Sequence, residues 1–131
     1  MGQVNATGIR GFSCTQALAP NLRVKLDATY GLELAGATDS EVGVVGQRHL
    51  VTGLGANTMA PVILPNAPGT LIMVAAGDFA AGSTVYGAAG GKIDNVENGC
   101  PIGIALEASG ADGDEVEVLR MPSMYVPHTH T

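Results

Sequence analysis

Two histidines near the end of the chain, His128 and His130, lie one residue apart in the sequence HTH. In an extended segment this spacing places both imidazoles on one side, and imidazole nitrogen is a common zinc ligand. A zinc site needs at least three protein ligands, and the surrounding residues 121–131 contain no Cys, Asp or Glu to supply another. We therefore predict that this pair holds no metal ion.

Carboxylates are the second group of side chains that could take part in chemistry. The segment ADGDEVE, residues 111–117, is too short for a calcium loop and lacks its terminal Glu. Asp94 and Glu97 could act as a pair, but no other reactive group converges on them, and the chain has no GxSxG, HExxH or Walker motif. We predict that the protein is not an enzyme and has no cofactor. The alternative, a ligand-binding β-barrel, needs a pocket that brings together distant residues such as His49 and Asp94.

The charge of the chain argues against nucleic acid as a partner. The net charge is −6, and the six basic residues are scattered, whereas phosphate binding needs clustered Lys and Arg. Arg23 and Lys25 come closest to a pair, and their alternation with apolar residues favours a solvated strand face for both. We therefore predict no binding to nucleic acid.

The apolar runs of the sequence are short. The longest, residues 71–76, is too short to span a bilayer, and the first residues contain no apolar core of signal-peptide length. These features predict a protein that is made in the cytoplasm and does not bind membranes. In that compartment Cys14 and Cys100 are expected to remain free thiols.

The elements that would position any site are short strands. No window has a helical period, and the 19 glycines argue against long helices. The run over residues 58–65 contains Pro61, which predicts an edge strand or a strand that begins after the proline. Residues 70–76 are the most apolar run and are expected to form a central strand. The other expected strands, bounded by Gly, Pro, Asn and Asp, cover residues 22–26, 31–35, 41–47, 83–87, 90–94, 101–107 and 114–120.

The two ends of the chain differ from its middle. The first dozen residues are small, polar and rich in glycine, and residues 121–131 contain two prolines and no acidic or basic side chain other than histidine. We predict an all-β fold, a small β-barrel or β-sandwich over residues 17–120. An extended N-terminal arm covers residues 1–16 and a C-terminal tail covers residues 121–131. Such arms could reach neighbouring subunits.

The same pattern occurs twice along the chain. LAPNLRV, residues 18–24, corresponds to FAAGSTV, residues 79–85. Each is followed by a turn glycine and then, after the same spacing, by a glycine between apolar strand residues, which gives the pairs Gly31 and Gly43, and Gly91 and Gly103. Glycine within a strand costs about 1 kcal/mol, so it is kept where another group comes close or where a sheet bends sharply. We predict an internal repeat with halves at residues 18–64 and 79–120.

Residues 80–119, AAGSTVYGAAGGKIDNVENGCPIGIALEASGADGDEVEVL, resemble a family of phage capsid cement, or head decoration, proteins. Members often have a Gly-rich segment, then a segment like PIGIALE, then an acidic ending. The first half of the chain fits the family more loosely, and residues 55–69 and the tail after Arg120 depart from its pattern. The matching residues are Gly82, Val85, Tyr86, Gly90, Gly91, Lys92, Ile102, Gly103, Ala105, Leu106, Glu107, Asp112, Gly113, Asp114, Val116 and Val118.

The resemblance implies a structural protein on the outer surface of a tailed-phage head. Proteins of this kind bind the major capsid protein, commonly as homotrimers, and stabilise the expanded shell against the pressure of packaged DNA. Symmetric association repeats a modest contact many times over the shell. The implied location is the outer capsid surface of the virion, after synthesis in the host cytoplasm.

The contacts with the shell or with a neighbouring subunit are expected in the N-terminal arm, at Val4, Ile9, Arg10 and Phe12. On this interpretation a chain without residues 1–16 still folds but no longer binds capsids. Other structural roles in a virion, in a tail tube or a spike, are an alternative that the residues leave open.

Overall fold

The computed structural model describes residues 8–14, 18–28, 31–39, 41–46, 59–65, 67–98 and 101–120. Over these residues the chain is all-β, as predicted, apart from one short 3-10 turn, η1 (Ala89–Gly91). The first five strands are β1 (Ile9–Ser13), β2 (Arg23–Leu26), β3 (Leu32–Leu34), β4 (Gly43–Val45) and β5 (Met59–Ile63). The second five are β6 (Leu71–Val74), β7 (Thr84–Gly87), β8 (Ile93–Asp94), β9 (Gly103–Ala105) and β10 (Glu115–Arg120).

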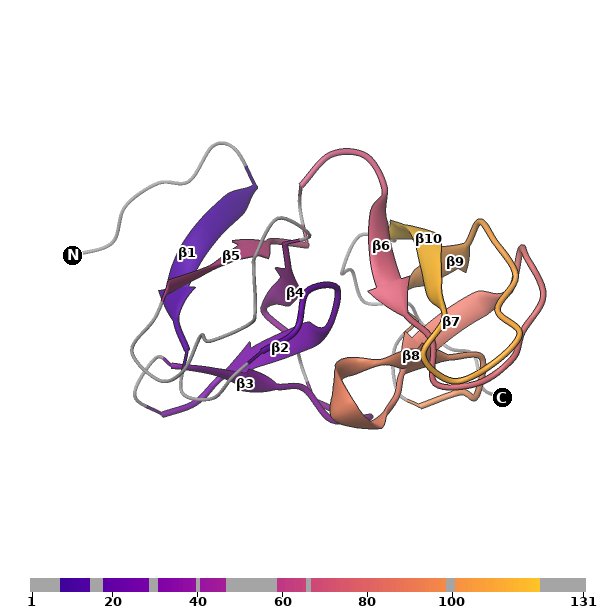
Figure 1. Ribbon diagram of the computed structural model, residues 1–131, viewed down its shortest axis with the longest axis horizontal. Coiled ribbons are helices and arrows are strands. Elements are labelled where there is room, and N and C mark those ends of the chain that lie inside the picture. The colour runs from indigo at the N-terminus through magenta and orange to yellow at the C-terminus, as the bar shows by residue number, and fades with distance from the viewer. Residues whose placement is uncertain are drawn as a thin grey trace, which may run out of the picture.

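The strands form two antiparallel sheets with the same internal order. The first sheet has the order β1-β5-β4-β2-β3 and the second the order β6-β10-β9-β7-β8, so each strand of one half has a counterpart in the other. Figure 1 shows the two sheets side by side, the first in indigo to magenta and the second in pink to yellow. This shared order confirms the predicted internal repeat.

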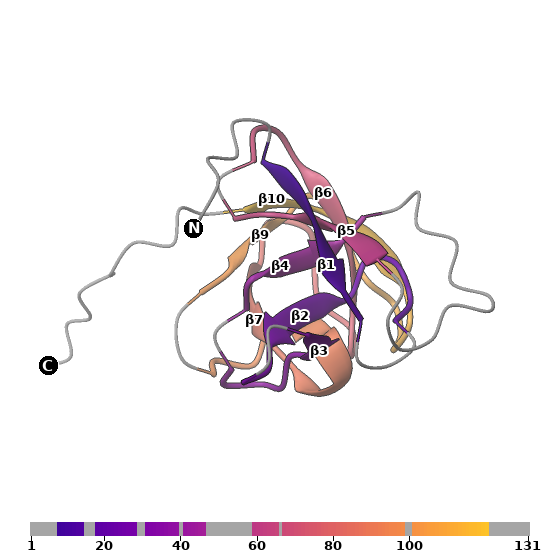
Figure 2. The same ribbon diagram turned by 90° about the vertical axis from the view of Figure 1, so that its left-hand side faces the viewer.

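The agreement extends to the register of the strands. Val24 lies opposite Gly43 in the first half, and Val85 lies opposite Gly103 in the second. In each half the residue after the first strand also makes a parallel bridge to the third strand, Cys14 with Leu32 and Ala75 with Ile93. Each sheet therefore curls until its first and last strands meet, as Figure 2 shows for the half that faces the viewer.

Each half has its own core, and each of the eight buried residues of the first core has a counterpart in the second. Alternate strand positions point inward, which is the period of two expected of strands. The second core also takes in Val44 of β4, with Ile63 of β5 packed against it, so the two halves share apolar contacts. The corresponding buried pairs are Phe12 and Met73, Cys14 and Ala75, Leu18 and Phe79, Val24 and Val85, Leu32 and Ile93, Val45 and Ala105, Ala60 and Val116, and Val62 and Val118.

The repeat begins earlier in each half than predicted. Residues 9–13 form β1, which pairs with β5 from Ile9 opposite Ile63 to Ser13 opposite Met59, so they are not part of an arm. The second half likewise begins with β6, before residue 79. β6 is also the end strand of its sheet and not a central one, although its Met73 is fully buried. Residues 1–7 and 121–131, predicted as arm and tail, lie outside the described residues.

Pro61 is tolerated in an inner strand. β5 contains Pro61 and lies between β1 and β4, so the expectation of an edge strand or a later start was wrong. The Pro61 carbonyl accepts a hydrogen bond from the Gly46 amide at 2.8 Å. Because N and C=O of one strand residue point to the same side, the missing N–H of Pro61 also faces Gly46. Gly46 lies just past the end of β4, where the ladder is already ending.

Candidate functional site

The contact between the two halves is centred on a buried arginine. Arg23 of β2 is 1% exposed and is the largest fully buried side chain among the described residues. Its Nη2 donates to the carbonyls of Gly36 at 3.0 Å and Ala88 at 2.8 Å, and its Nε donates to that of Lys92 at 3.0 Å. Because Ala88 and Lys92 flank η1 in the second half, the guanidinium joins the two halves through backbone acceptors. The prediction of a solvated face for Arg23 was therefore wrong.

A carboxylate links Arg23 to a second arginine. Glu41, just before β4, lies 3.6 Å from Arg23 Nη1 through Oε1 and 2.7 Å from Arg120 Nη2 through Oε2. Arg120 ends β10, so this Arg23–Glu41–Arg120 triad again joins the halves. All three side chains are at least mostly buried, with exposures of 1%, 13% and 7%. Glu41 Oε1 is buried and accepts no hydrogen bond from the described residues, so its interaction with Arg23 is one of charge.

Burial and pairing with Glu41 shift the pKa values of the two arginines in opposite directions. Loss of solvent lowers the pKa of Arg23 and of Arg120, and the negative charge of Glu41 opposes the shift in both. Arginine keeps its proton in proteins, so both guanidinium groups remain cations. One buried carboxylate thus faces two buried cations, which makes the triad sensitive to the loss of that carboxylate.

Further polar contacts cross between the halves. Asn21 Nδ2 donates to Glu115 Oε2 at 2.9 Å, and the Gly91 amide donates to the Ala35 carbonyl at 2.9 Å. Gly91 has φ +78°, and a Cβ added there would lie 2.8 Å from the Arg23 carbonyl oxygen. Glycine at this position therefore satisfies both a left-handed backbone and the close approach of β2.

The two strand glycines of the repeat, Gly43 and Gly103, occupy equivalent places against a neighbouring strand. A Cβ added at Gly43 would lie 2.5 Å from the Ile63 carbonyl oxygen of β5. One added at Gly103 would overlap the Leu119 carbonyl oxygen of β10 and lie 3.0 Å from Arg120 Cα. The close approach of another backbone, which the pattern indicated, is thus present at both positions.

The turn glycines do not match each other in the structure. The Asp27 amide donates to the Gly31 carbonyl, and at the equivalent place the Ala88 amide donates to the Lys92 carbonyl. Gly31 therefore corresponds to Lys92, and Gly91 is one residue out of register with it. Gly31 also donates its amide to Asp27 Oδ1 at 2.9 Å, which closes the turn between β2 and β3.

The residues predicted to contact a shell are split between surface and core. In β1, Ile9 is 51% exposed and Arg10 is also exposed, whereas Phe12 belongs to the first core. The Arg10 guanidinium lies over the Phe12 ring, 4.7 Å from its centroid. Phe12 therefore serves the fold, and Ile9 and Arg10 are the members of this group that a partner could touch. Val4 lies outside the described residues.

The side chains considered for chemistry are only partly described. His49, His128, His130 and Cys100 lie outside the described residues, so the predictions about them stay predictions. Cys14 is a free thiol in the first core, and burial raises its pKa. Within the described ranges, no three His, Cys, Asp or Glu side chains gather in a way that could hold a metal ion. Over the same residues, no helix is long and apolar enough to cross a membrane.

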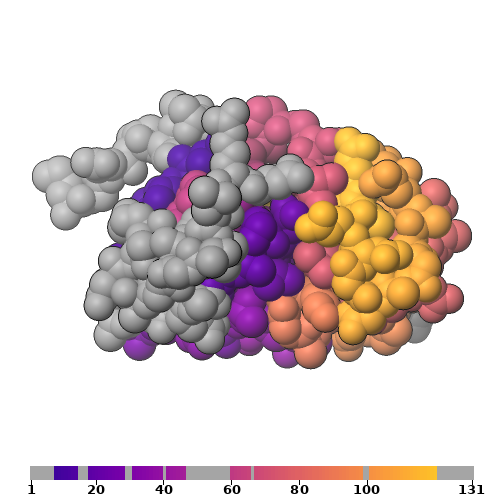
Figure 3. Space-filling model, viewed as in Figure 1, coloured from indigo at the N-terminus to yellow at the C-terminus, as the bar shows by residue number. Residues whose placement is uncertain are grey.

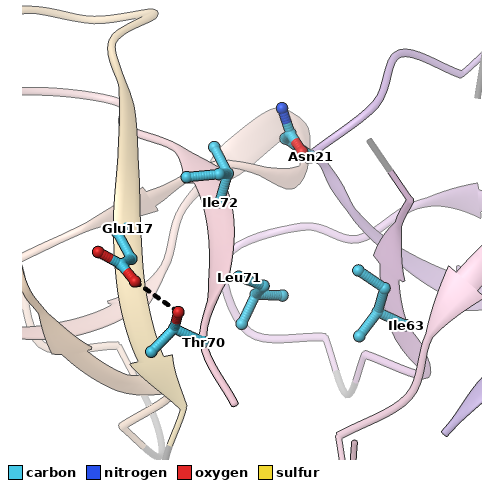
Figure 4. A pocket seen from close by; sticks show the side chains of 6 residues that line it. All are labelled: Asn21, Ile63, Thr70, Leu71, Ile72 and Glu117. Carbon is cyan, nitrogen blue, oxygen red and sulfur yellow. Dashed lines mark hydrogen bonds between the residues drawn. The ribbon is translucent and has the colours of Figure 1, made fainter. Parts of the chain in front are cut away.

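An open hollow of about 180 Å³ lies where the two halves meet. Its lining comes from both halves, and Figure 4 shows the Thr70 hydroxyl pointing to the Glu117 carboxylate beside it, at 2.5 Å. The other lining residues are Asn21, Ile63, Leu71 and Ile72. The hollow combines a carboxylate, an amide and a hydroxyl with three aliphatic side chains, and these form a surface on which a side chain could lie.

In comparisons with known proteins, no protein-family model and no curated protein matches the sequence.

Proposed function

We propose that the protein is a capsid decoration, or cement, protein that binds the outer surface of a tailed-phage head and stabilises the expanded shell. The proposed partners are the major capsid protein and further copies of the chain, arranged as a homotrimer on the capsid. The proposed location is the outer surface of the virion, and no cofactor is needed for such a role.

The observation that carries the proposal is the resemblance of residues 80–119 to the decoration proteins. Its glycines are ones that the backbone of the second half needs. Gly82, Gly90, Gly91 and Gly113 have φ values of +89°, +71°, +78° and +97°, which other residues adopt only with strain. Gly103 leaves no room for a Cβ against β10. The resemblance therefore rests on residues that specify a backbone, which makes chance similarity in composition a weaker explanation.

A structural role also agrees with how the halves are joined. Apolar contacts and a buried triad hold two small β units together, and a protein under mechanical load benefits from such a rigid unit. This agreement supports a structural role in the virion.

The test is the copy number of the protein in purified virus particles, measured by quantitative mass spectrometry against the major shell protein. We expect a ratio near one to one, because a cement protein has a site on every shell subunit. A few copies per particle would indicate a tail or spike component instead. Absence from the particle would overturn any virion role.

A further inference from the structure

The outer face of the second sheet carries apolar side chains where water would be expected to favour polar ones. In β10, Val116 and Val118 point into the core, so Glu115, Glu117 and Leu119 point outward. The apolar residues of this face are Ile72, Val74, Tyr86, Ile104, Leu106 and Leu119. Leu119 is 46% exposed and Leu106 is 43% exposed. We call these residues, with the acidic side chains among them, the second-sheet face.

The strand register places these residues beside one another. Leu119 lies opposite Ile104 across β10 and β9. Glu117 lies opposite Ile72 and Glu115 opposite Val74 across β10 and β6. Side chains directly opposite each other on an antiparallel pair are about 5 Å apart at Cβ, so the apolar and acidic groups form one continuous surface. Figure 3 shows the segments of β9 and β10, orange to yellow, at the molecular surface.

The second half is strongly acidic. Residues 71–120 contain eight acidic and two basic side chains, whereas residues 8–65 contain four of each. The two basic side chains of the second half are already paired, Lys92 with Asp112 at 2.8 Å and Arg120 with Glu41 at 2.7 Å. Among the described strand residues that point outward on the second sheet, none is Lys or Arg. The face is therefore apolar and acidic without a compensating cation.

The hollow between the halves opens at the β6 edge of this face. Ile72 and Glu117 belong both to the face and to the lining of the hollow. Figure 4 shows Glu117 beside the hollow, with Leu71 and Ile63 further along it. A long side chain with an aliphatic stem and a positive end could therefore lie in the hollow with its charge near Glu117.

We propose that the second-sheet face binds a segment of a partner protein that carries both apolar and basic side chains. Charge complementarity selects this occupant. A second copy of the same face would bring acidic groups against acidic groups, which is repulsive. Residues 1–7 and 121–131 contain no Lys or Arg, so they do not supply these basic side chains. If the protein is a capsid decoration protein, on which this assignment of the partner rests, the segment belongs to the shell protein.

The first test measures binding to expanded heads from which the protein has been removed. Leu119→Lys places a positive charge on the face and should weaken binding by about tenfold or more, as expected for a residue within an interface. The matched control is Leu26→Lys, at a residue of the first half that is 38% exposed, and it should bind within about twofold of wild type. Equal effects of the two variants would overturn the proposal.

The second test removes negative charge from the second-sheet face while keeping the shape of the side chains. Glu107 Oε1 accepts the Glu117 amide, and Glu117 Oε2 accepts the Thr70 hydroxyl, so glutamine at both positions keeps an acceptor and removes only charge. The double variant Glu107→Gln, Glu117→Gln should bind about threefold to tenfold more weakly at low salt, with the difference vanishing at high salt. The control, Glu33→Gln in β3, should bind like wild type. A double variant that binds like wild type at low salt would overturn the acidic part of the proposal.

The outcomes separate this inference from the proposed function. Heads that bind wild type and Leu119→Lys equally would overturn the assignment of the face and leave the decoration role standing. Heads that fail to bind wild type would overturn the decoration role and, with it, the shell protein as partner. Thermal unfolding of free Leu119→Lys should match wild type within about 2 °C, since the side chain is exposed. A larger fall in Tm would mean that the chain itself covers the second-sheet face, which also overturns the proposal.

Discussion

Replacing Glu41 by Gln should destabilise the protein more than the loss of any exposed ion pair. The change keeps the shape of the side chain and an oxygen that can still accept from Arg120. It removes the only carboxylate in contact with the two buried guanidinium groups among the described residues. Breaking a buried pair by removing one partner costs about 3–5 kcal/mol. Because Arg23 keeps three backbone acceptors and Glu41 is 13% exposed, we expect a cost near the lower end, about 3 kcal/mol.

Urea and thermal unfolding of purified protein measure this cost. For a chain of this length, 1 kcal/mol corresponds to about 3–5 °C, so the Tm should fall by about 9–15 °C. The matched control is Asp112→Asn, which removes the charge from an ion pair whose side chains are 32% and 64% exposed. That pair should contribute about 1 kcal/mol or less. A Glu41→Gln variant no less stable than Asp112→Asn would refute the view that the triad holds the halves together.

Three further predictions test other parts of the fold. Gly103→Ala should lower the free energy of unfolding in urea by about 1–3 kcal/mol, because its Cβ would meet the β10 backbone. The control is Gly110→Ala, whose Cβ would have only a 3.6 Å contact, and its stability should be close to that of wild type. Equal losses in the two variants would contradict the argument. Deleting residues 1–16 removes β1, so the circular dichroism melt should show a large loss of stability, and a melt like that of wild type would contradict the place of β1 in the sheet. The hydrogen bond from Lys25 lowers the pKa of Asp39, so Asp39 contributes stability that is fully present above its ordinary pKa and is lost as the pH falls through the lowered pKa. In acid titration the Asp39→Asn variant should therefore lose stability less steeply than wild type below that ordinary pKa, and parallel curves would count against this.

The strands and the repeat were predictable because their signals are local. The run at residues 22–26 alternates apolar and basic side chains between turn residues, and β2 is found there. The strand glycines were predictable because a glycine between valines or isoleucines has few explanations other than close approach. Gly43 and Gly103 follow the turn glycines Gly31 and Gly91 at the same spacing, and this indicated two equivalent strands.

β1 was missed because its signal is not local. IRGFS contains a glycine and only two apolar residues, and the strand exists because it pairs with β5, which is distant in the sequence. The separation of neighbouring strands in the sequence also explains why Pro61 was expected to lie in an edge strand. Whether a missing N–H matters depends on where the neighbouring strand ends, and the sequence does not contain that information.

The triad was missed because burial of Arg23 is decided by the other half. Strand alternation indicated an outward side chain, and it does point away from the first core, but η1 covers it. One signal was available in the repeat itself. The position equivalent to Arg23 is Thr84, so the two halves differ there, and a strong difference between repeats can mark a residue that serves the contact between them.

That difference has a consequence for which halves can pair with each other. Two halves with the same strand order could in principle associate with the wrong partner, such as a C-terminal half with another C-terminal half. Such a pair would have Thr84 in place of Arg23 and would leave the carbonyls that Arg23 binds without their donor. Two N-terminal halves would have Leu64 in place of Arg120 and would leave Glu41 without its closest cation. The triad therefore favours pairing of an N-terminal half with a C-terminal half over pairing of two like halves.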